Sequence, residues 1–94
     1  MNAADLLTAA AGLVSGDRAD QHGDMLLNHQ NIAAMWNAYL SIRREPGRHL
    51  MPDDVAIMMA LMKVARTQSG FANDDDLTDA AGYLAVSSQV TDYQ

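Results

Sequence analysis

The sequence from Asp53 to Arg66 reads DDVAIMMALMKVAR, and the other elements can be placed around it. The stretch follows Pro52 and begins with two aspartates, which suits the first turn of a helix. Its two cations, Lys63 and Arg66, come near the end, where the helix dipole favours positive charge. Between these charges the stretch is apolar on every side, as is typical of a helix that other helices surround. We predict a central helix over about residues 53–68.

Three further helices are predicted from composition and spacing. Ala, Leu and Met dominate the apolar residues, and this composition favours helices over strands, which prefer β-branched and aromatic residues. Apolar residues recur at helical spacing over about residues 3–15, 25–44 and 75–90. Asn2 and Asp24 are suitable N-caps for the first two of these helices. Because the connections are short, we predict an all-α fold, a compact four-helix bundle-like domain.

Length bears on domain organisation and on oligomeric state. The 94 residues make a single helical domain, residues 1–94, with no room for a second core. A central helix that is apolar all round needs more cover than three short neighbours supply. We therefore expect a homo-oligomer, a dimer or higher, in which part of that surface is buried between chains.

The charge and the missing cysteines argue against several functions. Twelve acidic and six basic residues give a net charge of −6, which argues against direct binding to nucleic acid or to an anionic membrane. Without cysteine there is no disulfide, thiolate nucleophile or thiolate metal site. No basic leader opens the sequence, and no apolar run reaches the length of a membrane span. We expect a soluble, cytoplasmic protein.

A first polar constellation, Arg18, His22 and Asp24, lies between the first two predicted helices. An imidazole beside carboxylates can exchange protons or bind a metal near neutral pH, but this spacing matches no metal motif. In the structural interpretation, Asp24 caps the second helix and the other two side chains pair with acidic neighbours. In the functional interpretation, Arg18 and His22 face a cleft and bind a ligand.

A second constellation consists of Asp54, Lys63, Arg66 and Asp79. The two cations are three residues apart, so they share a helix face. In the structural interpretation, Asp79 pairs with one of these cations across two helices. In the functional interpretation, the cations hold a phosphate or carboxylate while the aspartates hold Mg²⁺ through oxygen ligands.

Asn28 lies inside an apolar stripe, one turn from both Met25 and Ile32. A buried amide has to be hydrogen-bonded. We therefore expect Asn28 to bond either to a neighbouring helix or to a ligand.

Taken in order, several short motifs resemble a small domain family of unknown function from phage and prophage genomes. They are Ser15-Gly16-Asp17-Arg18, His22-Gly23-Asp24, Asn28, Ile32-Ala33, Trp36 with Tyr39, Asp54-Val55-Ala56, Met58-Met59, Lys63-Val64-Ala65-Arg66 and Asp79-Ala80-Ala81-Gly82-Tyr83. The resemblance covers nearly the whole chain. It implies a phage or prophage source, and thus the cytoplasm of the host cell, but it implies no activity.

A looser resemblance is to the MazG-type all-α nucleoside triphosphate pyrophosphohydrolases, which oligomerise and hold Mg²⁺ with acidic residues on two helices. Their signature is Glu-x-x-Glu on one helix and Glu-x-x-Asp on the next. Asp76 and Asp79 have the spacing of the second half, but the single glutamate, Glu45, lies in a connector. The resemblance implies a shared architecture and, in an enzyme, Mg²⁺ held by Asp54, Asp76 and Asp79, with His22 assisting.

The leading functional prediction is a non-enzymatic phage-type accessory protein that binds a nucleotide-like ligand, or that binds a host or phage protein through its acidic surface. The alternatives are a divergent Mg²⁺-dependent nucleotide pyrophosphohydrolase and an acidic mimic of nucleic acid that inhibits a host protein. Nucleophilic catalysis has no support, because the sequence has no glycine-rich phosphate loop, nucleophile elbow or His-Glu-x-x-His motif. The predicted ligand-binding residues are Arg18, His22, Asn28, Lys63, Arg66 and Tyr83.

Overall fold

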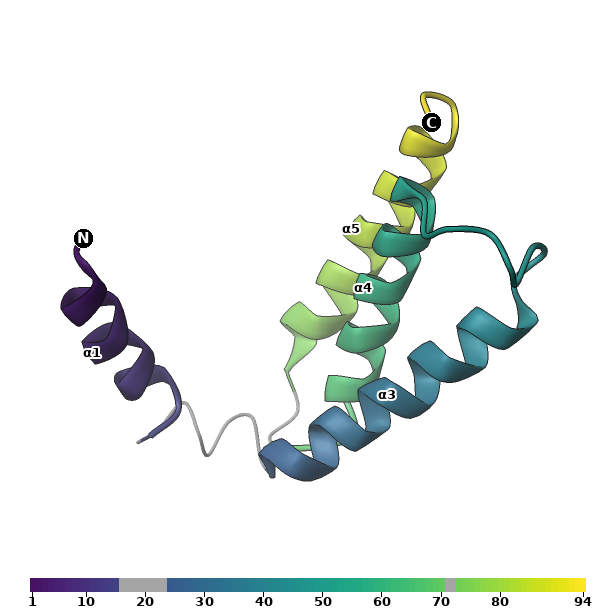
Figure 1. Cartoon of the computed structure of the whole chain (residues 1–94). Helices are drawn as coiled ribbons and strands as arrows, with labels where there is room; N and C mark the ends of the chain where they lie inside the picture. Colours follow the sequence, from purple (N-terminus) through teal and green to yellow (C-terminus); the bar gives the residue numbers. More distant parts are fainter. Residues whose placement is uncertain (16–23, 71–72) are drawn as a thin grey trace.

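The computed structural model of the chain describes residues 1–15, 24–70 and 73–94 (Figure 1). These residues form no strand but four helices, α1 (Ala3–Leu13), α3 (Met25–Ile42), α4 (Pro52–Arg66) and α5 (Asp74–Thr91). Every predicted helix end lies within two residues of the observed one. α4 packs against both α3 and α5, so the prediction of an all-α bundle is confirmed. Within the described ranges, no helix is long and apolar enough to cross a membrane.

Polar side chains cap the first turns of three helices. At α1, the backbone N–H of Asp5 donates to Asn2 Oδ1 over 2.8 Å, and the Asp5 carboxylate accepts from the Asn2 N–H over 3.3 Å. Asp24 and Asn73 accept in the same way from N–H groups in the first turns of α3 and α5, over 3.0 and 2.9 Å. Each cap satisfies a backbone donor that the helix itself leaves without a partner. The two caps predicted from the sequence, Asn2 and Asp24, are confirmed.

α4 is the central helix, as predicted. It runs side by side with α5 and is crossed by α3 (Figure 1). The indole N–H of Trp36 on α3 donates to the Met58 carbonyl in the middle of α4 over 2.6 Å. Most of the buried residues of α4 are small, which lets its neighbours approach closely; the full set is Asp54, Ala56, Met58, Ala60 and Ala65.

α4 and α5 are antiparallel and are tied together at both ends. At the start of α4, the Ser87 hydroxyl donates to the Asp53 carbonyl over 3.3 Å, and the Gln94 side chain accepts from the Asp53 N–H over 2.9 Å. At the other end of α4, the Lys63 ammonium lies 2.9 Å from an oxygen of Asp79. These polar contacts between α4 and α5 therefore lie at the two opposite ends of α4.

Most of α1 lies away from α4 and α5 (Figure 1), whereas its last residue, Leu13, lines a hollow together with Met62 and Arg66 of α4. None of its residues is buried. Leu6 and Leu7 leave 59% and 70% of their surface exposed, although both are large apolar side chains. The buried apolar core therefore belongs to α4 and α5, and α1 contributes nothing to it.

Candidate functional site

Of the predicted site residues that the structure describes, most lie together at one end of the molecule. This is where α3 begins, α4 ends and α5 begins. The charged part of this site consists of Lys63, Arg66, Asp76 and Asp79, and we call it the ion-pair cluster. Beside it lies a hollow that both Asn28 and Arg66 line, and we call this hollow the Asn28 pocket.

The ion-pair cluster links the last turn of α4 to the first two turns of α5. Lys63 lies 2.9 Å from Asp79 and 3.9 Å from Asp76, and Arg66 Nε lies 3.4 Å from the same oxygen of Asp76. Asp76 has a nearly buried side chain, whereas that of Asp79 is 47% exposed. The predicted pairing of Asp79 with a cation of the central helix is confirmed, and the cation is Lys63. Two positive and two negative charges cancel within the cluster.

The Asn28 pocket is an apolar hollow with polar groups among its lining residues. Its volume is about 280 Å³. Asn28 is 8% exposed, and its side-chain carbonyl accepts a hydrogen bond from the Ser69 hydroxyl over 3.3 Å. The prediction of a buried, hydrogen-bonded amide is therefore confirmed, and its partner lies just beyond α4. The residues that line the pocket are Leu13, Val14, Met25, Asn28, His29, Ile32, Met62 and Arg66.

His29 was not predicted as a site residue. Its Nδ1 lies 2.6 Å from the Met25 carbonyl, one turn back along α3. A carbonyl can only accept, so Nδ1 carries the proton, and in the neutral ring Nε2 is an acceptor. The pocket thus combines an amide, an imidazole and the guanidinium of Arg66 with apolar walls. The place of His29 in this pocket could not be predicted from the sequence. A histidine on an exposed turn of a helix has no evident role until the residues that surround it in the fold are known.

The other predicted site residues lie elsewhere. Asp54 is in the first turn of α4, at the opposite end from Asp76 and Asp79, so the three aspartates proposed to hold Mg²⁺ do not converge. Across the described ranges there is no group of three His, Cys, Asp or Glu side chains that could hold a metal ion. Tyr83 is half-buried on α5, one turn beyond Asp79. Arg18 and His22 lie outside the described residues.

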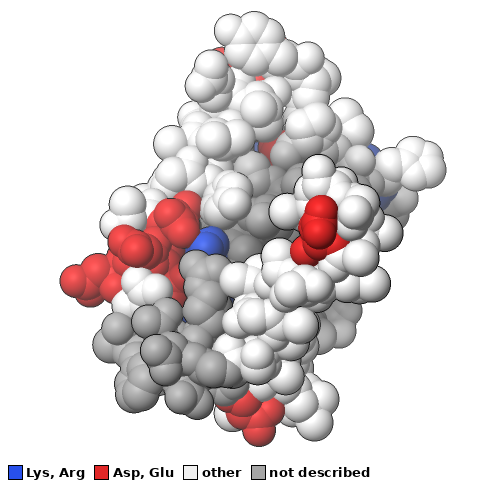
Figure 2. Space-filling model, turned by 90° about the vertical axis from the view of Figure 1, so that its left-hand side faces the viewer, with Lys and Arg blue, Asp and Glu red and all other residues white. Residues whose placement is uncertain are grey.

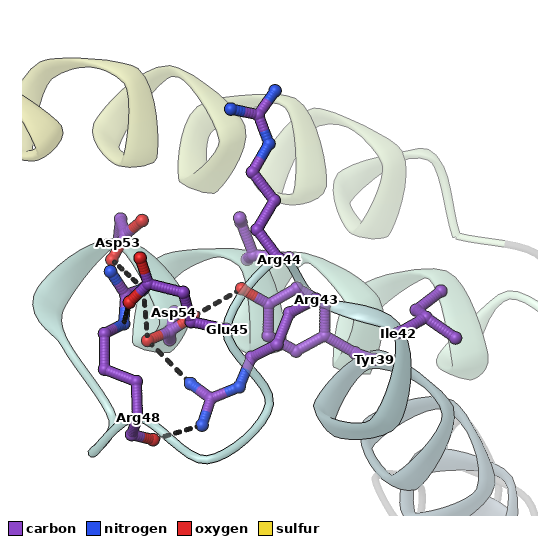
Figure 3. A pocket seen from close by; sticks show the side chains of 9 residues that line it. Tyr39, Ile42, Arg43, Arg44, Glu45, Arg48, Asp53 and Asp54 are labelled. Atoms are coloured by element: carbon purple, nitrogen blue, oxygen red, sulfur yellow. Dashed lines mark hydrogen bonds and ion pairs between the residues drawn. The ribbon is translucent and has the colours of Figure 1, made fainter.

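A second hollow, of about 590 Å³, lies at the opposite end of α4 (Figure 3). The end of α3, the connector that follows it and the start of α4 line it. Three of its lining residues are arginines, and three are acidic. They are Arg43, Arg44, Arg48, Glu45, Asp53 and Asp54.

Asp54 is the centre of a buried network in this hollow (Figure 3). Its carboxylate is 1% exposed and accepts from Tyr39 Oη over 2.6 Å, from the Met51 N–H over 2.9 Å, from Arg43 over 3.0 Å and from Arg48 over 3.2 Å. Arg43 also donates to the backbone carbonyls of Pro46 and Arg48, which fixes the connector. We call Tyr39, Arg43, Arg48 and Asp54 the Asp54 network.

The Asp54 network shifts the pKa values of its acid and its phenol. Burial by itself raises the pKa of Asp54, but hydrogen bonds from Tyr39, Met51 and Arg43, with the charge of Arg43, outweigh burial and lower the pKa from 3.8 to about 2. Burial and the hydrogen bond to the Asp54 carboxylate raise the pKa of Tyr39 from 10.0 to about 12. The acid stays ionised and the phenol stays protonated at neutral pH. Because its oxygens are already occupied, Asp54 is a structural residue that joins α3 and the connector to α4.

A family described as a domain of unknown function (DUF6378) matches residues 5–91 of the chain. Two similar relatives are the Gene 55 protein of Mycobacterium phage L5, 40% identical over 81 residues, and the Gene 55 protein of Mycobacterium phage D29, 33% identical over 85 residues. These matches cover 86% and 90% of this chain and 49% and 52% of the relatives, so the chain spans about half the length of the curated relatives it matches. No solved structure matches the chain.

Proposed function

This chain belongs to the DUF6378 family, as its resemblance to a phage domain of unknown function predicted, and on that premise we propose that it acts by binding a small anionic ligand of nucleotide type in the Asn28 pocket. The observation that carries the proposal is the pocket itself. Apolar side chains form its walls, while an amide, an imidazole and a guanidinium line it as well. Small-molecule sites have this composition, with a few polar groups that orient a ligand held mainly by apolar contact.

The size of the pocket supports a nucleobase-sized group. A volume of about 280 Å³ lies just below the range of roughly 300 to 1,000 Å³ found for drug-sized ligands. Asn28 and His29 together offer hydrogen-bond donors and acceptors, as the edge of a base requires. A base would thus occupy the apolar hollow, and attached phosphates would extend out of it.

Arg66 supports the anionic part of the ligand. It lines the pocket, and a guanidinium has five N–H donors in a planar fork that suits phosphate or carboxylate. Its Nε also lies 3.4 Å from an oxygen of Asp76. Lys63 does not line the pocket and pairs with Asp79 at 2.9 Å, so we assign ligand recognition to Arg66.

Isothermal titration with nucleoside mono-, di- and triphosphates, with and without Mg²⁺, tests the proposal. We expect heat of binding without turnover. Arg66→Gln should weaken the affinity about tenfold or more, since a charge-assisted hydrogen bond is lost. Arg44→Gln is the matched control: it removes the same charge from the exposed Arg44 of the other hollow and should leave the affinity unchanged. Circular dichroism confirms that both variants fold.

Other outcomes point to the other functions. Equal losses of affinity in both variants would contradict the proposal, because the nucleotide would then not be bound specifically in the Asn28 pocket. No heat with any nucleotide would also contradict it, and would favour a protein partner engaged through the acidic surface. Release of pyrophosphate that requires Mg²⁺ and disappears in Asp79→Ala would replace binding by pyrophosphohydrolase activity.

A further inference from the structure

α1 carries an apolar stripe that is largely exposed in the described chain. Leu6, Leu7 and Val14 are exposed by 59%, 70% and 59%, and Leu13 by 49%. With Ala10 they lie on one side of the helix, because they recur at helical spacing. We call these five residues the α1 stripe. The stripe continues onto α3, since Leu13, Val14 and the 54% exposed Met25 line the same pocket.

The whole chain exposes more surface than a compact monomer of its mass. A protein of 10.2 kDa should expose about 5,300 Å², whereas this chain exposes 6684 Å². The difference is about 1,400 Å². The radius of gyration is 15.5 Å, against about 12 Å for a compact domain of this length. An obligate homodimer buries roughly 1,000 Å² or more on each chain, so the excess is of the size that one such interface covers.

The charges around α1 favour a second copy over other partners. The only charged side chain within α1 is Asp5. Figure 2 shows the side of the molecule on which α1 lies in Figure 1, and its acidic side chains include a large cluster at the left of the view. Two chains of net charge −6 repel one another least where the contact is made by a helix with a single charge, as α1 is. α1 itself offers no cation to an anionic membrane and only one anion, Asp5, to a basic partner.

We propose that the α1 stripe is covered by a second copy of this chain, in a two-fold symmetric dimer. In such a dimer the same surface patch is used on both subunits, so one self-complementary apolar stripe is sufficient. This inference does not rest on the proposed ligand, although Leu13 and Val14 of the stripe also line the Asn28 pocket. Leu6 and Leu7 do not line the Asn28 pocket, so changes at these positions test the dimer without touching the ligand site.

Sedimentation velocity of the full chain over a range of concentrations tests the proposal. We expect a species of about twice the 10.2 kDa of one chain that dissociates on dilution. Leu6→Gln and Leu7→Gln should each raise the dissociation constant at least tenfold, because each removes a large apolar side chain from the interface. Both changes preserve net charge and nearly preserve helix propensity. Thr8→Gln, on the opposite side of α1, is the matched control and should leave the dimer intact.

Two results would overturn the proposal. One is a wild-type chain that remains monomeric at hundreds of micromolar, which would mean that α1 is left exposed or is covered by its own chain or by a different protein. The other is a dimer that Leu6→Gln and Leu7→Gln leave unchanged, which would place the contact elsewhere. Far-UV circular dichroism of each variant distinguishes loss of the interface from loss of helix.

Discussion

Replacing Asp54 by Asn should destabilise the fold severely. The change keeps the shape of the side chain but removes the charge that neutralises Arg43, whose side chain is only 8% exposed. Removing one partner of a buried ion pair costs about 3 to 5 kcal/mol, because the remaining charge is left uncompensated. A domain of 94 residues has roughly 5 to 14 kcal/mol of stability in total. Loss of this one carboxylate therefore removes a large part of it.

The same variant should alter how stability depends on pH. A carboxyl whose folded-state pKa is lowered stabilises the fold above its ordinary pKa, and this contribution is lost as the pH falls toward the folded-state value. A pKa lowered from 3.8 to about 2 for Asp54 corresponds to about 2 kcal/mol. About 1 kcal/mol of it is lost between neutral pH and about pH 3. The difference in unfolding free energy between wild type and Asp54→Asn should narrow by that amount.

Urea unfolding followed by far-UV circular dichroism, at neutral pH and near pH 3, measures both effects. Asp53→Asn is the matched control, because Asp53 is the neighbouring residue and its side chain is 18% exposed with a single ion pair of 3.6 Å to Arg48. We expect the control to lose less than about 1 kcal/mol. If Asp54→Asn costs no more than the control, or if its cost does not change with pH, the structural assignment of Asp54 is wrong.

Three further predictions concern single contacts. Tyr39→Phe should lower stability by about 1 to 2 kcal/mol in urea, and it should remove the phenolate absorbance that otherwise appears near pH 12, since the pKa of Tyr39 is about 12. That pKa is raised on folding, so the contribution of Tyr39 is present below about pH 10 and is lost as the pH rises toward 12. Asp76→Asn should cost about 2 kcal/mol or more in the same unfolding assay, and Asp79→Asn less than about 1 kcal/mol, because only Asp76 is buried; equal costs would contradict this ranking. Asn2→Ala should reduce the helix content of α1 by removing its capping box, at a cost of about 1 kcal/mol, and NMR chemical shifts of α1 that stay helical would contradict it.

The helices could be predicted because their signals are local. Each signal acts within a few residues of the chain. These signals are Pro52 with the two aspartates that follow it, the helix caps Asn2 and Asp24, and the spacing of apolar residues. The central place of α4 followed from its lack of a polar face. The pairing of Asp79 with Lys63 was also within reach, since the sequence suggested that two helices would meet there.

The Asp54 network could not be predicted, because its partners meet only after the chain has turned back on itself. Tyr39 lies within an apolar stripe of α3 in the sequence, and Arg43 and Arg48 flank Pro46 in what reads as a solvated connector. Asp54 reads as a helix-start acid that could equally join the aspartates of α5. The direction in which the connector returns decides between these arrangements, and no local pattern encodes that direction.

The contact between Trp36 and the Met58 carbonyl gives the molecule a built-in optical reporter. Trp36 is the only tryptophan, and its indole N–H reaches the backbone of α4 from α3 over 2.6 Å. Its emission should therefore shift to the red when α3 separates from α4, as the indole becomes hydrated. Fraying of α1 should leave the emission unchanged, because no residue of α1 is buried in the core that surrounds Trp36. A single unlabelled sample can thus separate the opening of the core from events at the amino-terminal helix.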